Sequence, residues 1–173
     1  ALFSDHGFHL GEKERWAKRS LWEDGTRVPV VVASPGHKPG QKTNRPAELL
    51  DVFPTLLELA GLPADSTQEG QSLVPLMKNP QREWNHPAIT SFGLGNYSVR
   101  STRYRFIQYF DGSRELYDLS KDPHEWKNLI DNPKLEKVIQ EHASFIPQKQ
   151  HPILPGSSTG HKAYAAAKKK LNK

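Results

Sequence analysis

Cysteine is absent from the 173 residues of the chain, which excludes disulfide bonds and zinc sites built on cysteine. Long apolar runs are absent too, and none approaches the roughly 20 residues that a membrane-spanning helix needs. Hydrophobic residues make up 35% of the chain, and its mean hydropathy is −0.72. Both values are low for an α/β domain, so we expect one moderate core and a part of the chain that is uncovered or disordered.

Acidic residues are missing from the last stretch of the chain, His161 to Lys173, where lysines are frequent. Much of the net charge of +5 comes from this stretch. Only Tyr164 there could stack on a nucleic-acid base, so the charge does not favour nucleic acid as a partner. The pattern predicts a basic, disordered tail over residues 147–173, with weak contact to polyanions as the alternative. It indicates no oligomeric state.

The start of the chain is a short apolar run, Ala1 to Phe3, that stops at the turn Ser4-Asp5-His6-Gly7. This is typical of a buried strand that delivers polar groups to the end of a sheet, where ligands of open α/β sheets bind. A carboxylate beside an imidazole can serve a metal ion, a general base or a helix cap. The two residues alone also fit a plain structural role, with Asp5 in a turn and His6 as its polar neighbour.

The region up to residue 85 reads as mixed α/β. The β-branched run from Val28 to Ala33 predicts a strand buried on both faces, and residues 35–46 predict an exposed loop. A helix is expected to begin at Asp51 as N-cap and to end at Gly61, because apolar residues between them recur at helical spacing. A short helix or turn follows over residues 72–76.

From His86 the apolar period changes to that of strands. Four short strands are expected, followed by a helix over residues 134–144 that covers one face of the sheet. The strands span Ala88–Ser91, Tyr97–Arg100, Tyr104–Phe110 and Glu115–Leu119, with Asp111-Gly112 as a hairpin turn. We therefore divide the chain into an α/β part (1–85), a small antiparallel-sheet part with its helix (86–146) and the tail (147–173).

Five ordered motifs together resemble the type I sulfatases of the alkaline-phosphatase-like superfamily, and iduronate sulfatases in particular. They are Ser-Asp-His-Gly-Phe-His-Leu-Gly-Glu with Trp-Ala-Lys-Arg (4–19), Thr-Arg-Val-Pro (26–29), Asp-Val-Phe-Pro-Thr-Leu-Leu-Glu-Leu-Ala-Gly (51–61), Glu-Gly-Gln-Ser-Leu (69–73), and Glu-Leu-Tyr-Asp-Leu with Asp-Pro-His-Glu-Trp-Lys-Asn-Leu (115–129). The resemblance implies an α/β fold of which this chain is the C-terminal part: the end of the large mixed sheet and a four-stranded antiparallel sheet with a covering helix.

The resemblance also implies roles for individual residues. Asp5 matches a calcium ligand, and His6 matches a residue at the metal and the nucleophile. Imidazole is an unusual partner for calcium, so His6 could instead hydrogen-bond the nucleophile. Lys18 matches a lysine that binds a sulfate oxygen, with Arg19 as its rival. His9 falls where some relatives place a substrate-binding residue, although a histidine in a polar turn is more often only solvated.

The implied reaction is hydrolysis of a sulfate ester by a formylglycine hydrate, with calcium and basic side chains holding the sulfate. The formylglycine motif, Cys/Ser-x-Pro-x-Arg, does not occur in this sequence, nor do the paired aspartates of the family. We therefore expect the nucleophile on a preceding segment, an inactive isolated chain, a sulfated small molecule or glycan as substrate, and a periplasmic or secreted enzyme. The alternatives are a noncatalytic anion-binding remnant and a phosphoester hydrolase of the same superfamily.

Several other polar residues invite a functional interpretation, but a structural one is favoured for each. Loop hydrogen bonding is expected of three residues near the first turn, and three residues near strand ends could face substrate but more often only meet water. The former are Glu12, Glu23 and Arg27, and the latter are His86, Asn96 and Arg100.

Overall fold

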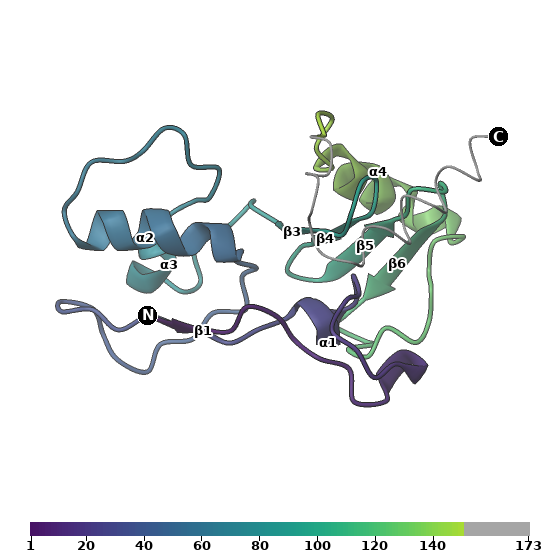
Figure 1. Cartoon of the computed structure of the whole chain (residues 1–173), viewed down its shortest axis with the longest axis horizontal. Coiled ribbons are helices and arrows are strands. Elements are labelled where there is room, and N and C mark those ends of the chain that lie inside the picture. Colours follow the sequence, from purple (N-terminus) through teal and green to yellow (C-terminus); the bar gives the residue numbers. More distant parts are fainter. Residues whose placement is uncertain (151–173) are drawn as a thin grey trace, which may run out of the picture.

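The computed structural model of the chain describes residues 1–150. Figure 1 shows two ends joined by a long N-terminal segment. One end, the helical region, comprises residues 28–85 with the first strand beside them. The other end, the sheet region, comprises residues 86–146. The chain from residue 4 to residue 27, called here the site segment, runs from the first strand to a position beneath the sheet region and back (Figure 1).

The sheet region contains a four-stranded antiparallel sheet in the order β3-β4-β5-β6. The strands are β3 (Ala88–Ser91), β4 (Tyr97–Arg100), β5 (Tyr104–Gln108) and β6 (Arg114–Asp118). This confirms the predicted sheet, although β5 ends two residues earlier than expected. The hairpin between β5 and β6 turns at Gly112, whose φ of 87° favours glycine.

Alternation along the strands divides the sheet region into two packed faces. Val99, Phe106 and Leu116, all 0% exposed, pack with Ile139 of α4 (Glu136–Ser144), which follows the 3-10 turn η3 (Pro133–Leu135). On the opposite face Ile107 packs against Leu21 of the site segment. The predicted helix over one face is confirmed, and the site segment covers the other.

The helical region is built on α2 (Val52–Leu59), which follows the 3-10 turn η2 (Leu49–Asp51) and confirms the predicted helix. The expected short helix is α3 (Val74–Lys78). Asp51 is predicted to cap α2 and does precede its first residue, but its side chain makes no capping hydrogen bond to α2. Its buried carboxylate instead accepts hydrogen bonds from the backbone N–H groups of Glu48 (2.8 Å) and Gln71 (2.7 Å). These bonds pair two backbone donors that belong to different stretches of the chain.

The two strands of the helical region differ from expectation. β1 (Leu2–Phe3) and β2 (Val30–Val31) pair antiparallel with each other, and no third strand joins them within residues 1–150. The prediction that residues 1–3 and 28–33 form buried strands is wrong for this structure, since Leu2 is 67% exposed and Val31 55%. The reason is that nothing in the described part of the chain covers either face of so small a sheet.

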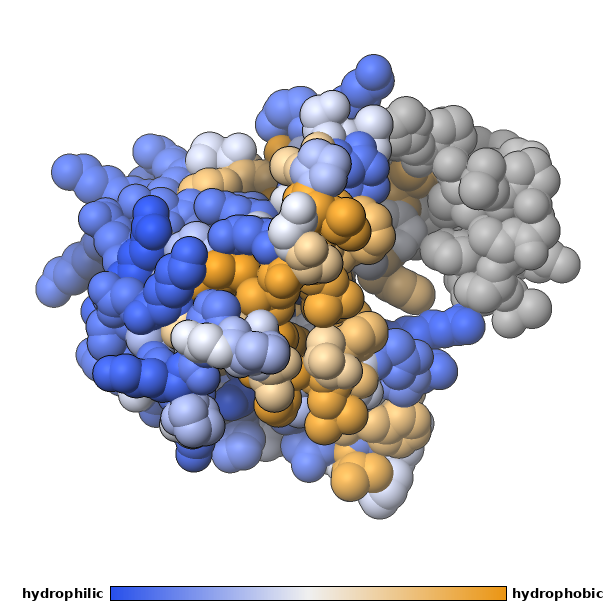
Figure 2. Space-filling model, turned by 90° about the vertical axis from the view of Figure 1, so that its left-hand side faces the viewer, coloured by the Kyte–Doolittle hydropathy of each residue, from blue (hydrophilic) through white to orange (hydrophobic). Residues whose placement is uncertain are grey.

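An apolar area on the molecular surface accompanies these strands. Figure 2 shows it on the side of the molecule where β1 and α2 lie in Figure 1. The exposed apolar residues of this region include Leu2, Phe3, Val31, Phe53 and Leu56. Uncovered apolar area of this kind marks a surface that packs against something else.

The predicted tail lies largely outside the described residues. The helices within residues 1–150 include none that is long and apolar enough to cross a membrane.

Candidate functional site

The site segment folds back on itself, and this brings its first and middle parts together. Backbone N–H groups of Gly7, His9 and Gly11 donate to the carbonyl groups of Gly25 (3.1 Å), Ala17 (2.9 Å) and Arg15 (2.9 Å). The segment also contains the 3-10 turn η1 (Glu12–Glu14) and the short helix α1 (Glu23–Thr26). A Cβ atom at Gly7 would lie 2.1 Å from the Asp24 carbonyl oxygen, so only glycine fits this close approach.

The back-folding places three predicted site residues beside one another. Lys18 Nζ lies 2.9 Å from His6 Nε2, and His6 Nε2 lies 3.6 Å from an Asp5 carboxylate oxygen. His6 Nδ1 lies 2.8 Å from its neighbour's carbonyl oxygen, that of Gly7. That contact requires the proton on Nδ1, which leaves Nε2 free to accept from the lysine ammonium group.

The cluster is open to solvent. The Asp5 side chain is 84% exposed, the His6 side chain 36%, and Lys18 is exposed. One end of the cluster therefore offers a carboxylate to a cation, and the other offers an ammonium group to an anion. Arg19, the rival of Lys18, makes no contact with Asp5 or His6 among the described residues, so the structure brings Lys18 to the cluster and not Arg19.

His9 occupies a different environment from the other three. It is 0% exposed, with Nε2 2.6 Å from Ser20 Oγ and its ring edge-on to Trp22 at 6.1 Å between centroids. The ring is enclosed by the site segment, so the predicted contact with substrate would require this turn to open. The role of His9 in substrate binding stays a prediction.

A buried ion cluster lies directly beneath the site segment, and sequence reasoning missed it. Arg105 of β5, whose side chain is 3% exposed, donates through Nη1 to the Leu21 carbonyl (3.0 Å) and to Ser98 Oγ (2.6 Å). Its Nη2 donates to the carboxylate of Glu23, and its Nε lies 2.7 Å from a carboxylate oxygen of Glu125. The second Glu125 oxygen accepts from the Glu23 backbone N–H (2.8 Å).

The two acids of this ion cluster differ in their electrostatics. Burial works to raise the pKa of Glu23, but the guanidinium groups of Arg105 and Arg100 outweigh it and the pKa lies below its ordinary value. For Glu125 burial is the larger effect, and its pKa is raised. A signal for the cluster was present in the sequence, because Arg105 interrupts an apolar strand with a charge that must find a partner.

The residues for which a structural role was favoured do have structural partners. The Glu12 carboxylate accepts a hydrogen bond from the Leu10 N–H (2.6 Å), and Arg27 Nη1 lies 3.7 Å from a Glu23 carboxylate oxygen. Asn96 bonds the Phe92 carbonyl (2.8 Å) and the Phe110 N–H (3.1 Å), and Arg100 Nε lies 3.3 Å from a Glu23 oxygen. His86 is the exception: its Nε2 lies 3.6 Å from a Glu48 carboxylate oxygen and 3.7 Å from an Asp51 carboxylate oxygen, but this buried nitrogen has no hydrogen-bond partner among the described residues.

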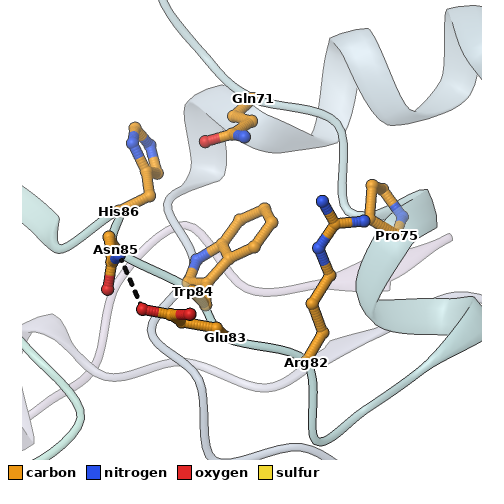
Figure 3. Close-up of a pocket in the computed structure, with 7 residues that line it drawn as sticks. All are labelled: Gln71, Pro75, Arg82, Glu83, Trp84, Asn85 and His86. Atoms are coloured by element: carbon orange, nitrogen blue, oxygen red, sulfur yellow. Dashed lines mark hydrogen bonds between the residues drawn. The ribbon is translucent and has the colours of Figure 1, made fainter.

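His86 also lines a shallow pocket of about 270 Å³ in the helical region. Figure 3 shows Trp84 in its wall, with the Gln71 side chain on one side and Glu83 on the other. None of Asp5, His6, His9 or Lys18 lines this pocket, so it is separate from the predicted site.

A comparison with family models matches residues 11–151 to the family described as N-sulphoglucosamine sulphohydrolase, C-terminal. Among curated proteins, the chain is 42% identical over 147 residues to a sulfatase of Formosa agariphila, covering 85% of this chain and 29% of that protein. It is 32% identical over 160 residues to a Delta 4,5-hexuronate-2-O-sulfatase of Bacteroides thetaiotaomicron, covering 84% of this chain and 33% of that protein.

A solved structure of a protein in complex with its substrate D-glucosamine-2-N,6-O-disulfate superposes on this chain with a TM-score of 0.72 and 26% identity. The match covers 82% of this chain and 32% of the solved one. The chain thus spans about a third of the length of the proteins that it matches.

Proposed function

Because the chain belongs to the sulfatase family and corresponds to the C-terminal part of its members, we propose that it contributes one side of the active site of a sulfate ester hydrolase. The single observation that carries the proposal is the convergence of Asp5, His6 and Lys18, with 2.9 Å between Lys18 Nζ and His6 Nε2. The predicted fold class, the C-terminal part of an alkaline-phosphatase-like α/β fold, is confirmed by the structural match and the sheet region.

Lys18 is proposed to bind an oxygen of the sulfate group. Lys18 is exposed, and its ammonium group forms one hydrogen bond, to His6 Nε2. The group therefore presents a compact positive charge to solvent. Such a charge stabilises the negative charge that gathers on the sulfate oxygens as the ester bond breaks. His6 keeps the ammonium group in place through Nε2, which is the catalytic part that we propose for it.

Asp5 is proposed as a calcium ligand and His6 as its neighbour at the metal. The exposed Asp5 carboxylate fits a hard cation, whereas both ring nitrogens of His6 already have partners. His6 would meet the ion only if Lys18 turned away towards substrate. Calcium takes about six to eight oxygen ligands, so the other ligands must come from outside this chain. When bound, calcium supplies positive charge that holds sulfate oxygens, and the formylglycine hydrate supplies the attacking oxygen.

The substrate class proposed is a sulfated small molecule or glycan. Two relatives support the glycan: one is named for a hexuronate 2-O-sulfate, and one structural neighbour holds a disulfated glucosamine. The likeness to iduronate sulfatases remains part of this proposal. The membership of the sulfatase family supports a periplasmic or secreted enzyme, and we propose that location.

The isolated chain is proposed to be inactive, because it has no Cys/Ser-x-Pro-x-Arg motif to supply the nucleophile. The test compares two proteins, the 173 residues alone and the longer protein of which they are the C-terminal part, each with a chromogenic sulfate ester and the matching phosphate ester. Sulfate release by the longer protein alone is expected. Turnover by the isolated chain, or faster release of phosphate than of sulfate by the longer protein, would contradict the proposal. No turnover of either ester would favour an anion-binding remnant.

A further inference from the structure

Lys18 lies on an exposed stretch of the site segment that has a firm attachment to the sheet region on each side. The attachment before it is Lys13, and the attachment after it is the pair of Leu21 and Glu23. Both attachments depend on a cation: Lys13 itself in the first, and Arg105 of β5 in the second.

The first attachment holds the ammonium group of Lys13 among three aromatic rings. Nζ lies 4.6 Å from the ring centroid of Tyr117, 5.2 Å from Trp22 and 5.7 Å from Trp126. It also donates to the backbone carbonyl of Glu125. Cation–π contacts of this kind gain strength when the cation is withdrawn from water. The backbone of Lys13 adopts φ 54°, a left-handed conformation that needs such tertiary support in a non-glycine residue.

The second attachment, at Leu21 and Glu23, is made by Arg105 of β5. Its guanidinium group binds the Leu21 carbonyl and the Glu23 carboxylate at the same time, and its Nε forms an ion pair with a Glu125 carboxylate oxygen at 2.7 Å. Leu21 and Trp22 contribute apolar contacts to the same face of the sheet, and Trp22 Nε1 donates to Glu115 of β6 (2.8 Å). The site segment is therefore fixed at residues 21–23 by charge, hydrogen bonds and burial together.

Residues 14–20 span the distance between these attachments, and they carry Lys18 to His6. Within them, the His9 N–H to Ala17 carbonyl bond (2.9 Å) aligns Lys18 with the first turn. If either attachment were released, the span would gain freedom and the ammonium group would leave its place beside His6 more often. A displacement of about 1 Å at a reacting group can lower a rate by about 100-fold.

We infer that Lys13 and Arg105 are positioning residues, which act on the reaction only through the placement of Lys18. The inference rests on the proposed function. It assigns Arg105 of the sheet region a task in catalysis beyond packing.

The activity test uses the longer protein and the variants Lys13→Met and Arg105→Lys, each with and without Lys18→Ala. Arg105→Lys keeps the charge and loses the forked contacts. Each single variant is expected to lower kcat/KM about 10-fold to 100-fold. In the Lys18→Ala background each is expected to change kcat/KM less than twofold, because the group that it positions is gone. Full additivity in both cycles would overturn the inference.

Arg103→Met is the matched control, because Arg103 also binds a carboxylate, that of Asp118 at 2.6 Å, but has no contact with the site segment through its side chain in the described part of the chain. Its kcat/KM is expected to change less than twofold.

A second measurement needs no activity and uses the 173-residue chain itself. The ring resonances of His6 and the hydrogen exchange of the His9 amide report the Lys18–His6 arrangement. The His6 resonances and the His9 exchange rate are expected to change in Lys13→Met and in Arg105→Lys. In Arg103→Met they are expected to equal those of the chain without substitutions. Unchanged His6 resonances in both test variants, with the sheet intact by circular dichroism, would overturn the inference. An inactive longer protein with these spectral changes would count against the proposed function alone.

Discussion

The sheet region and the helical region differ in how far their apolar side chains are buried. In the sheet region Val99, Phe106 and Leu116 are fully buried, because α4 covers one face of the sheet and the site segment covers the other. In the helical region Leu2 and Phe53 remain 67% and 49% exposed, because nothing in the described chain lies over them. The sheet region therefore encloses a core within the described chain, whereas the helical region has an apolar face that no described residue covers.

This difference bears on the candidate site. Asp5 and His6 follow directly from β1 of the uncovered region, whereas Lys18 lies between residues 13 and 21–23, which contact the sheet region. The candidate site thus lies on the site segment, between the sheet region with its closed core and the helical region with its exposed apolar face. The proposed calcium ligand Asp5 and the uncovered apolar face lie on the same part of the chain.

The largest expected effect separates the two regions by stability. Phe106→Ala is expected to lower the free energy of unfolding by about 4 kcal/mol, because it leaves a cavity in the closed core. Phe53→Ala removes a half-exposed side chain and is expected to cost less than about 1 kcal/mol in the isolated chain. Urea unfolding followed by tryptophan fluorescence measures both. Equal losses would show that the contrast between the regions is wrong.

The next effect concerns the ion cluster between the sheet region and the site segment. Arg105→Met leaves the carboxylates of Glu23 and Glu125 buried without their main partner and is expected to cost about 3 kcal/mol. Arg103→Met removes a half-exposed partner of Asp118 and is expected to cost under about 1 kcal/mol, since solvent screens that pair. The same unfolding experiment compares the two. A smaller loss for Arg105→Met than for Arg103→Met would contradict the packing described for the site segment.

The smallest effect is a pH dependence confined to the sheet region. Hydrogen bonds from Arg103 lower the pKa of Asp118 from 3.8 to about 2. A carboxylate whose pKa is lowered by folding stabilises the folded state at any pH above its pKa in the unfolded chain. This contribution is lost as the pH falls from about 4 to about 2. Midpoints of thermal unfolding across this interval should fall less in Asp118→Asn than in the unchanged chain. Equal slopes would mean that the Arg103 contact does not persist in solution.

Sequence patterns predicted the sheet region well because its evidence is local. Alternation over four or five residues, a glycine turn and a helical period identify β3 to β6 and α4 without knowledge of their neighbours. The same reasoning failed for Leu2–Phe3 and Val30–Val31. Their composition is that of buried strands, but burial depends on what covers them, and that information lies outside the strands themselves.

The candidate site divides in the same manner. The motif around Asp5, His6 and Lys18 named three candidate residues, and the back-folding of the site segment brings their side chains together. The cluster of Glu23, Arg105 and Glu125 joins residues from three separate stretches of the chain. The charge of Arg105 within an apolar strand indicated that a partner was needed, but no local pattern could reveal which residues those partners are. The burial of His9 escaped prediction for the same reason, because Ser20, Trp22 and Gly25 enclose it only after folding.

The role proposed for Lys18 is tested by the rate of sulfate ester hydrolysis by the longer protein after Lys18→Ala, with Lys42→Ala in the exposed loop as the control. Loss of an ammonium group that stabilises transition-state charge is expected to lower kcat/KM by about 100-fold or more, and the control is expected to stay within twofold. An unchanged kcat/KM in Lys18→Ala would show that Lys18 does not bind the sulfate group in the reaction.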